Sequence, residues 1–595
     1  MRTYFHDTVI VGSGAAGYNC ADILKGLGKS DVAVVTEGRE KGTSRNAGSD
    51  KQTYYKLALS ASSPDGVGEM ARDLFAYGGM DGDLALAMAA GSVQSFMKLV
   101  ELGVPFPKNA YGEFVGYQTD HSVKQRATSA GPLTSRYMTE ALEGRALQRG
   151  LLLYDGYVCV KIYADEAGVQ GVLCADLHVK EGDMAVFFAC NHLVVAAGGQ
   201  PGVYASHVYP AGQTGCMGVL ADAGVTFSNL HHWQYGLASL SFKWNVSGSY
   251  QQALPAYISV DAAGNQREFL TEGYALPADM LKDIFLKGYQ WPFDVKKRNG
   301  SSRIDLLVLE ETRKGNRVYL DYRRNPKGLE TGLAAAGEEA CAYLQKSGAL
   351  GRTPLERLEA LNPAAIQLYR DHGIDLYKEP LEIGVCAQHQ NGGVYVDAHW
   401  QSDIRGLYVI GEAAGTFGAY RPGGSALNAG QVGAMRCAEH IAAHPRKTVP
   451  AAPPVPPPAL YADKEAPADP RGFRRRMDRY AGIIRDREQM LLLLEEVRRE
   501  LQRPVGRAVG LGELQWRRER QYQVVLLCSF LYGLEQQGSV GGAVGMSGGA
   551  SQPAVVGREG KLLLTRGEAC RLAEPRSIPE GEQWFESVWN QSRSR

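Results

Sequence analysis

A glycine pattern near the start of the chain constrains the fold more than any other feature. Gly12, Gly14 and Gly17 have the spacing G-x-G-x-x-G, between an apolar run over 7–11 and a stretch of helical character. A second apolar run ends at Glu37, twenty residues after Gly17. A strand, turn, helix and parallel strand within about 30 residues place a helix N-terminus against a pyrophosphate and an acid against a ribose.

This pattern predicts a dinucleotide site. The first glycine permits the sharp turn, the second lets the backbone approach phosphate oxygens, and the third lets helix and strand pack closely. The same glycines without their flanking elements would indicate only an ordinary turn. The expected contacts come from the turn, the start of the helix and the acid: Gly12, Ser13, Gly14, Ala15, Ala16, Gly17 and Glu37.

Two further apolar runs end in glycine, far from the first in sequence. One leads to Ala197 and Gly198, and the other leads to Gly411 and Glu412. Each alone is also consistent with a plain strand and turn. The segment 425–440 is rich in Ala and Gly and has a helical period, so free N–H groups at its start would face the same pocket.

Three glycine-ended strands spread over some 400 residues predict a cofactor domain that is interrupted by an insertion. The expected fold class is α/β, with a Rossmann-like cofactor domain, an inserted capping domain and a C-terminal helical region. Six prolines within 450–458 indicate an extended connector. The predicted units are a discontinuous cofactor domain at 1–232 and 377–445, a capping domain at 233–376, a proline-rich linker at 446–470 and a helical domain at 471–595.

The C-terminal region shows helical periodicity. Its apolar residues recur at three, four or seven positions, which predicts one stripe on a single long helix. The arginines at the start of that helix favour a solvated or subunit-facing surface. A second helix is expected over 513–537, a flexible loop over 538–549 and an aromatic anchor at the C-terminus. The stripe comprises Phe473, Met477, Tyr480, Ile484, Leu491, Leu494 and Leu501, and the anchor comprises Trp584, Phe585 and Trp589.

Composition narrows the class of protein. Lys+Arg and Asp+Glu are both 64, so no overall charge favours nucleic acid or an anionic membrane. The ten cysteines form no C-x-x-C pair, and no metal site is indicated. The longest apolar run, 524–534, is too short to span a bilayer, and the N-terminal residues do not read as a signal segment. The sequence therefore predicts a soluble, cytoplasmic protein.

Taken together, the G-x-G-x-x-G unit, the His192–Gly199 strand and the segment GLYVIGEAAG resemble the flavoprotein family of fumarate reductase, succinate dehydrogenase and L-aspartate oxidase. The resemblance covers about the first 230 residues and 380–445, and in layout the cap and C-terminal helices. It implies an FAD-dependent oxidoreductase that exchanges hydride between flavin N5 and a substrate carbon under a capping domain.

The resemblance also assigns individual residues. Glu412 matches the acid that holds the ribitol of FAD, and Ser425 and Leu427 match the helix-start pair whose backbone faces the flavin O2 edge. His389, in CAQHQNGG, matches a histidine that contacts a substrate carboxylate, and Arg421, in YRPGGSAL, matches the substrate-binding arginine. Structural alternatives are a capped strand end for His389 and a salt bridge for Arg421.

Three departures limit what the resemblance implies. Gly236-Leu-Ala replaces the His-Pro-Thr that supplies a second carboxylate clamp in the family. Lys282 stands at the position of the arginine proton donor, where an exposed cap lysine is the alternative reading. Near Arg45 the histidine that tethers FAD covalently in respiratory members is absent, so noncovalent FAD is expected.

Two functions follow as hypotheses. The first is an oxidoreductase, with Arg421, His389 and Lys282 as catalytic residues, that acts at a C–C or C–N bond of a small molecule with one anionic group or of an enone. The missing clamp argues against fumarate and succinate. The alternative is an FAD-containing electron-transfer or binding subunit that docks on a partner protein through the proline-rich segment and the arginine-rich helix.

Overall fold

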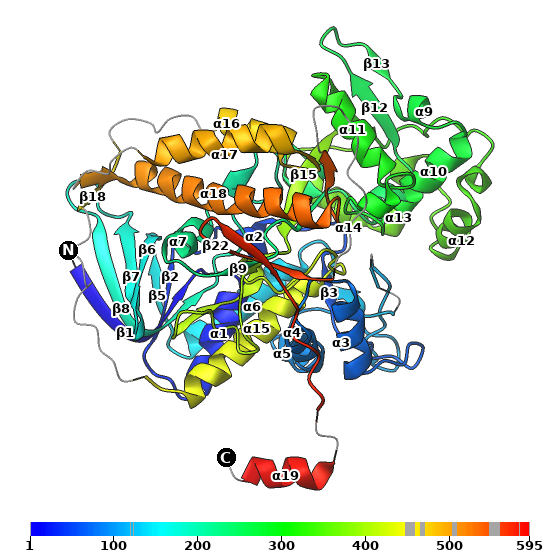
Figure 1. The fold of residues 1–595 in the computed structure, drawn as a ribbon. Coiled ribbons are helices and arrows are strands. Elements are labelled where there is room, and N and C mark those ends of the chain that lie inside the picture. Colours follow the sequence, from blue (N-terminus) through cyan, green and yellow to red (C-terminus); the bar gives the residue numbers. More distant parts are fainter. Residues whose placement is uncertain are drawn as a thin grey trace.

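The computed structural model describes residues 2–119, 121–122, 124–446, 459–463, 471–502, 508–546, 560–581 and 584–593. Most of the proline-rich segment, including 447–458, lies outside the described residues. Figure 1 shows a sheet-containing body, a second lobe at the upper right formed by the inserted region, and C-terminal helices that run across the top of the body.

A seven-stranded sheet organises the body, in the order β5-β2-β1-β8-β7-β6, with β17 paired to β8. β1, β2, β5, β8 and β17 pair in parallel, whereas β7 and β6 continue the sheet in antiparallel fashion. β8 is buried along its whole length, as expected for a parallel strand covered on both faces. The strands are β1 (Arg2–Val11), β2 (Val32–Thr36), β5 (Leu152–Asp155), β6 (Tyr157–Asp165), β7 (Gly168–Asp176), β8 (Ala185–Val195) and β17 (Leu407–Val409).

Two helices separated by some 400 residues pack side by side against this sheet (Figure 1). They are α1 (Ala15–Gly26) and α15 (Ser425–Ala443). A Cβ atom at Gly430 of α15 would lie 3.6 Å from the Cβ of Ala16, an ordinary contact that small residues make possible. The remaining helices of the body are α2 (Thr43–Asn46), α3 (Val67–Ala76), α4 (Gly82–Ala90), α5 (Ser92–Glu101), α6 (Thr134–Gln148) and α7 (Met217–Asp222).

The inserted region has its own six-stranded sheet, ordered β11-β10-β15-β14-β12-β13, and its own buried apolar cluster from Leu237 to Ile383. Its first and last long strands, β10 and β15, are antiparallel neighbours at the base of the lobe. The division proposed at 233 and 376 remains a prediction. The strands are β10 (Trp233–Ser239), β11 (Trp244–Asn245), β12 (Ala256–Val260), β13 (Gln266–Arg267), β14 (Arg317–Asp321) and β15 (Leu381–Gln390).

Helices cover the second sheet. One of them, α13, starts with a complete capping box, in which Thr353 accepts from the backbone of Glu356 and Pro354 occupies the first turn. The helices of the lobe are α8 (Ser249–Gln252), α9 (Leu270–Gly273), α10 (Pro277–Leu286), α11 (Arg303–Arg313), α12 (Glu338–Lys346), α13 (Pro354–Leu361) and α14 (Pro363–Asp371).

The single long C-terminal helix predicted from the apolar stripe is wrong. Helix α16 (Arg471–Tyr480) ends before Gly482, and strand β19 (Ile484–Asp486) separates it from α17 (Arg487–Leu501). β19 pairs in parallel with β21 (Val544–Met546), a distant partner that local periodicity does not reveal. The expected loop over 538–549 therefore contains a strand in its described part. Helix α18 (Leu511–Gln537) agrees with the predicted second helix.

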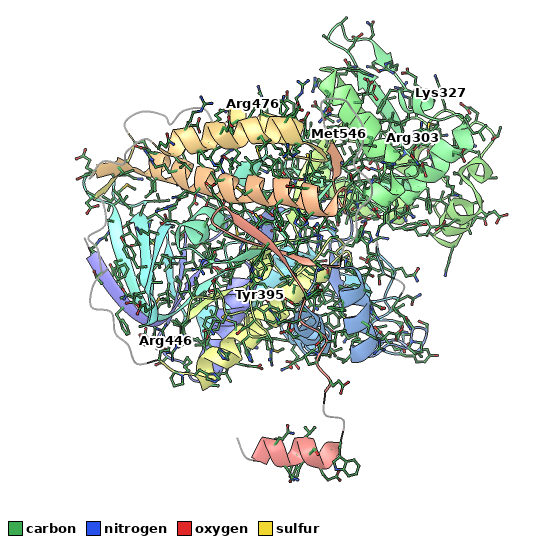
Figure 2. All side chains as sticks on the ribbon, in the orientation of Figure 1. Arg303, Lys327, Tyr395, Arg446, Arg476 and Met546 are labelled. Carbon is green, nitrogen blue, oxygen red and sulfur yellow. The ribbon has the colours of Figure 1, made fainter. Side chains whose placement is uncertain are left out.

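The arginines of α16 bind within the chain. Arg474 pairs with Glu519 of α18 at 2.5 Å, and Arg476, labelled in Figure 2, pairs with Glu496 of α17 at 2.5 Å. These contacts join the three C-terminal helices, which explains part of the arginine cluster without a partner protein.

The C-terminal segment returns to the body. Strand β22 (Leu562–Arg566) pairs with β23 (Ala569–Ala573) and with β9 (Phe227–Ser228), and β9 pairs with β16 (Gly393–Val394). The last helix, α19 (Phe585–Arg593), projects from the body in Figure 1. Trp584, Phe585 and Trp589 are 63%, 68% and 51% exposed, so the predicted aromatic anchor is wrong. Within the described residues, no helix combines the length and apolar character that crossing a membrane requires.

Candidate active site

A cavity of about 830 Å³ lies where the glycine turns of the body meet the inserted region. Most of the predicted site residues line it, although they come from widely separated segments. Gly17, Ser425 and Lys282 are not among the lining residues. Those that do line the cavity are Gly12, Ser13, Gly14, Ala15, Ala16, Glu37, Ala197, Gly198, His389, Gly411, Glu412, Arg421 and Leu427.

The end of the cavity formed by Gly12–Ala16 and Glu37, here called the dinucleotide end, is shaped by backbone. Gly12 has φ +112°, and a Cβ atom there would lie 2.5 Å from the carbonyl oxygen of Ala196. Gly14 forms the N-cap of α1 with extended backbone. Gly17 acts behind the cavity, because a Cβ atom there would lie 2.1 Å from the carbonyl oxygen of Gly12. The predicted reasons for Gly12 and Gly17 agree with their surroundings, and the phosphate contact expected at Gly14 stays a prediction.

Polar side chains at the dinucleotide end already have partners. Glu37 Oε2 accepts from Thr214 Oγ1 at 2.7 Å, and the Ser13 and Thr36 hydroxyls are 2.8 Å apart. The backbone N–H of Ala15 donates to Ser44 Oγ at 3.2 Å. A carboxylate offers about four acceptor positions, so Glu37 keeps capacity for ribose hydroxyls.

Glu412 is a half-buried residue that lines the cavity. Burial raises its pKa, and hydrogen bonds from Tyr209 and from two backbone N–H groups act in the opposite direction. Gln390 N–H donates to Oε1 at 3.0 Å, and Gly199 N–H donates to Oε2 at 3.3 Å. These donors fix the position of the carboxylate. The role predicted for Glu412, holding the ribitol of FAD, would require such an acceptor.

The start of α15 corrects one predicted contact. Both the backbone N–H and the hydroxyl of Ser425 donate to the carbonyl oxygen of Pro422, at 3.1 Å and 2.7 Å. Ser425 is therefore turned away from the cavity, because the preceding turn takes up its donors. Ala426 and Leu427 line the cavity instead and bring the positive end of the helix to it.

Arg421 lines a second part of the cavity, here called the substrate end, which is formed by Gln388, His389 and Arg421. Its Nε and Nη2 donate to Gln234 Oε1 at 3.0 Å and 2.5 Å. The guanidinium also lies 5.9 Å from the ring centroid of Phe417. The side chain is 9% exposed, so it brings a positive charge, fixed by a neutral partner, to the wall of a buried pocket.

His389 faces the same end as a neutral imidazole. Burial lowers its pKa well below the ordinary value, and the charge of Arg421 lowers it further. Asn391 donates its Nδ2 to the carbonyl oxygen of Gly418 at 3.1 Å, which turns its Oδ1 toward His389 Nδ1 at 3.0 Å. Nδ1 then carries the proton, and Nε2 is an acceptor. This Nε2 is buried and has no hydrogen-bond partner among the described residues.

Lys282 does not reach the cavity, which corrects its predicted position. Lys282 is exposed on α10. The buried face of this helix presents Leu281, Ile284 and Phe285 to the apolar cluster of the inserted region. The inserted region lines the cavity through Phe285 and through the segment after α10, including Trp291. Lys282 lies on the solvent-exposed face of α10. A short motif match does not define the face of the helix on which a residue lies.

Two glutamines were missed by sequence reasoning. Gln388 lines the cavity beside His389, and Gln234 orients Arg421. Gln234 lies opposite His389 in the β10–β15 pairing, which brings two distant segments together. Both glutamines lie in segments that the sequence analysis singled out. Only the register of β10 against β15 shows that Gln234 and Gln388 belong to the site.

The lining residues fit FAD. The close approach at Gly12 leaves backbone for a pyrophosphate, and the N-termini of α1 and α15 both border the cavity. Glu37 and Glu412 line the same cavity and would supply acceptors for the hydroxyls of a ribose and a ribitol. His389 Nε2 is a buried polar atom that is left open in the wall of the same cavity.

Comparison with known proteins agrees with this geometry. A sequence model of the FAD binding domain family matches residues 7–427. The L-aspartate oxidase of Agrobacterium fabrum is 25% identical over 489 residues, which are 80% of this chain and 81% of that protein.

Solved structures of low sequence identity share the fold. E. coli quinol fumarate reductase FrdA has a TM-score of 0.66 at 18% identity and is covered over 98% of both chains. Mycobacterium smegmatis Sdh1 has a TM-score of 0.68 at 16% identity, with 100% of this chain and 98% of that chain covered.

Proposed function

Because the chain belongs to the FAD binding domain family and is an FAD-dependent oxidoreductase of the fumarate reductase and L-aspartate oxidase type, we propose that it acts on a small carboxylate. The reaction would be oxidation or reduction of the C–C or C–N bond next to that carboxylate. The observation that carries the proposal is the buried pair Arg421 and His389 at one end of the FAD cavity. FAD, when bound, supplies the two-electron acceptor or donor. We also propose that FAD is held without a covalent bond.

Arg421 binds the substrate carboxylate in this proposal. Its guanidinium is planar and always charged, so it suits bidentate contact with a carboxylate, and burial strengthens that contact. Gln234 keeps the side chain in one orientation before substrate arrives. Less conformational freedom is then lost on binding, which supports a fixed position for the substrate.

His389 moves the proton. As a neutral ring with Nδ1 protonated, it accepts a proton at Nε2 when the substrate is oxidised, and it returns that proton when the substrate is reduced. Asn391 keeps this tautomer in place. Phe285 and Trp291 of the inserted region line the same cavity.

Arg421→Ala tests the proposal. We expect a loss of at least about 30-fold in kcat/KM across a panel of amino acids and saturated and unsaturated carboxylates, because a buried charge contact is worth about 2–5 kcal/mol. Bound FAD, measured by absorbance after gel filtration, should stay at the wild-type level. Arg136→Ala is the matched control, because Arg136 is exposed on α6 and contacts Glu140.

Full activity in Arg421→Ala would reject the carboxylate-binding role. The alternative, an FAD-containing electron-transfer subunit without a substrate of its own, makes a different prediction. It expects no member of the panel to reduce or reoxidise the bound flavin in either protein. The same measurement therefore separates the two functions.

A further inference from the structure

The amide of Gln388 is an open hydrogen-bonding group in the wall of the cavity. Both Oε1 and Nε2 are buried and have no hydrogen-bond partner among the described residues. The residue is 8% exposed and lines the cavity next to His389. Leaving a buried polar group unpaired costs about 1–3 kcal/mol, so such a group indicates a missing ligand.

A β-bulge directs Gln388 into the cavity. In the pairing of β10 with β15, Gln234 lies opposite His389, but the next residue, Tyr235, lies opposite Ala387. Gln388 is therefore the extra residue of β15. Consecutive residues of a regular strand point to opposite faces, whereas a bulge can turn a side chain toward a site. Gln388 and His389 both line the cavity for this reason.

Gly236 of β10 leaves the space that the amide occupies. A Cβ atom at Gly236 would lie 3.1 Å from Gln388 Nε2, 3.2 Å from Gln388 Oε1 and 3.2 Å from the carbonyl oxygen of Trp291. Any side chain at this position would press on the amide. Gly236 and Gln388 thus form one structural pair on neighbouring strands. Together they present the neutral amide of Gln388 to the cavity.

We propose that Gln388 binds a neutral group of the substrate that carries a hydrogen-bond donor and an acceptor side by side, as a carboxamide or a lactam does. The inference rests on the proposed function, since the same substrate places its carboxylate at Arg421. A carboxamide satisfies Oε1 and Nε2 together through two reciprocal hydrogen bonds. A carboxylate offers acceptors only, so it would leave Oε1 unpaired and place a negative charge near the partial negative charge of that oxygen. The substrate is accordingly a monocarboxylate with a second, uncharged polar group.

Three matched probes test this specificity. Succinamate, succinate and butyrate share one carboxylate and differ at the other end, which is a carboxamide, a carboxylate or a methyl group. Their Kd values for the FAD-loaded protein are measured by titration calorimetry and by the ligand-induced change in flavin absorbance. We expect succinamate to bind at least about tenfold more tightly than either of the others.

Gln388→Met removes the amide but keeps an unbranched side chain of similar length. We expect succinamate to bind this variant no more tightly than butyrate, with butyrate itself changed less than about threefold. Gln367→Met is the control, because Gln367 is exposed on α14 and donates to Asp371 at 2.7 Å. Gly236→Ala is a second variant that should reduce the succinamate preference by displacing the amide without removing it.

The outcomes separate the two proposals. If the three probes bind the wild type equally, and all lose affinity in Arg421→Ala, the role of Gln388 is overturned while the carboxylate site stands. If none of the probes binds, the proposed function fails and this inference fails with it. An unliganded flavin spectrum or FAD content that changes in Gln388→Met would make Gln388 a cofactor contact, and would also overturn the inference.

Discussion

At the dinucleotide end of the cavity the ligand-facing surface is mostly backbone, whereas at the substrate end it consists of long polar side chains. Ser13 and Glu37 are hydrogen-bonded within the protein. By contrast, the side-chain amide of Gln388 and the Nε2 atom of His389 have no hydrogen-bond partners among the described residues. The difference indicates that the polar side chains named at the dinucleotide end are satisfied within the protein, whereas the substrate end keeps some buried polar atoms open. A substitution should therefore do different damage at the two ends.

Gly12→Ala should have the largest effect. The new Cβ atom would lie 2.5 Å from the carbonyl oxygen of Ala196, so the backbone that faces the pyrophosphate must shift. We expect purified protein without yellow colour, measured as absorbance of bound flavin. Gly28→Ala is the control, because Gly28 also has positive φ, at +83°, but a Cβ atom there would meet nothing within 4 Å. It should keep FAD and cost about 1–2 kcal/mol of stability.

His389→Gln should come next. We expect turnover to fall by about 100-fold to 10,000-fold, the usual contribution of a general acid–base group, while FAD content stays unchanged. A loss of bound FAD as large as the loss of turnover would show that His389 contacts the cofactor. It would contradict the assignment of His389 to the substrate end.

The pH profile of the wild type sharpens the assignment of His389. Because burial lowers the pKa of His389 in the unliganded protein, kcat/KM for substrate oxidation should stay flat as the pH falls through about 6.5, the ordinary histidine value. Activity should decrease only in more acidic solution, where Nε2 binds a proton and no longer accepts one. An acid limb centred at or above about 6.5 would contradict the neutral, buried ring.

Acid should also lower the stability of the whole molecule. Burial lowers the pKa of His192 to about 4 and that of His231 to about 3. Their folded pKa values lie below the unfolded value, so the unfolded chain binds more protons and stability falls as the pH drops below about 6.5. Each such group accounts for about 2 kcal/mol at about pH 5. The melting temperature should fall from pH 7 to pH 5, and His192→Leu should fall less over the same range.

Lys282→Ala should have the smallest effect. The side chain is exposed on α10 and does not line the cavity, so stability should change by less than about 0.5 kcal/mol. Steady-state kinetics should match the wild type. A large loss of kcat would show that α10 turns Lys282 inward during the reaction.

The contrast between the two ends also explains what could be predicted from sequence. The glycines of the dinucleotide end were predictable because their function depends on local backbone and on spacing within one short segment. Glu412 and Arg421 were identified by resemblance to longer motifs. The α/β fold with a sheet of mostly parallel strands followed from the glycine-ended strands, and the family comparison confirms it.

The remaining features depend on contacts between distant segments. Gln388 is directed inward by a bulge that exists only when β10 pairs with β15. Ser425 is a local exception: it is turned away because Pro422, three residues before it, accepts both of its donors, although the helix start itself was correctly placed. The break between α16 and α17 is accompanied by the pairing of β19 with β21. None of these is encoded in the periodicity of a single segment.

A structure of the protein crystallised with FAD and succinamate would test the account most directly. We expect density for FAD that runs from the Gly12 turn to the start of α15 at Leu427. The succinamate carboxylate should lie within hydrogen-bond distance of Arg421, and its carboxamide should contact Gln388. Density for FAD elsewhere, or a carboxylate bound away from Arg421, would contradict the account.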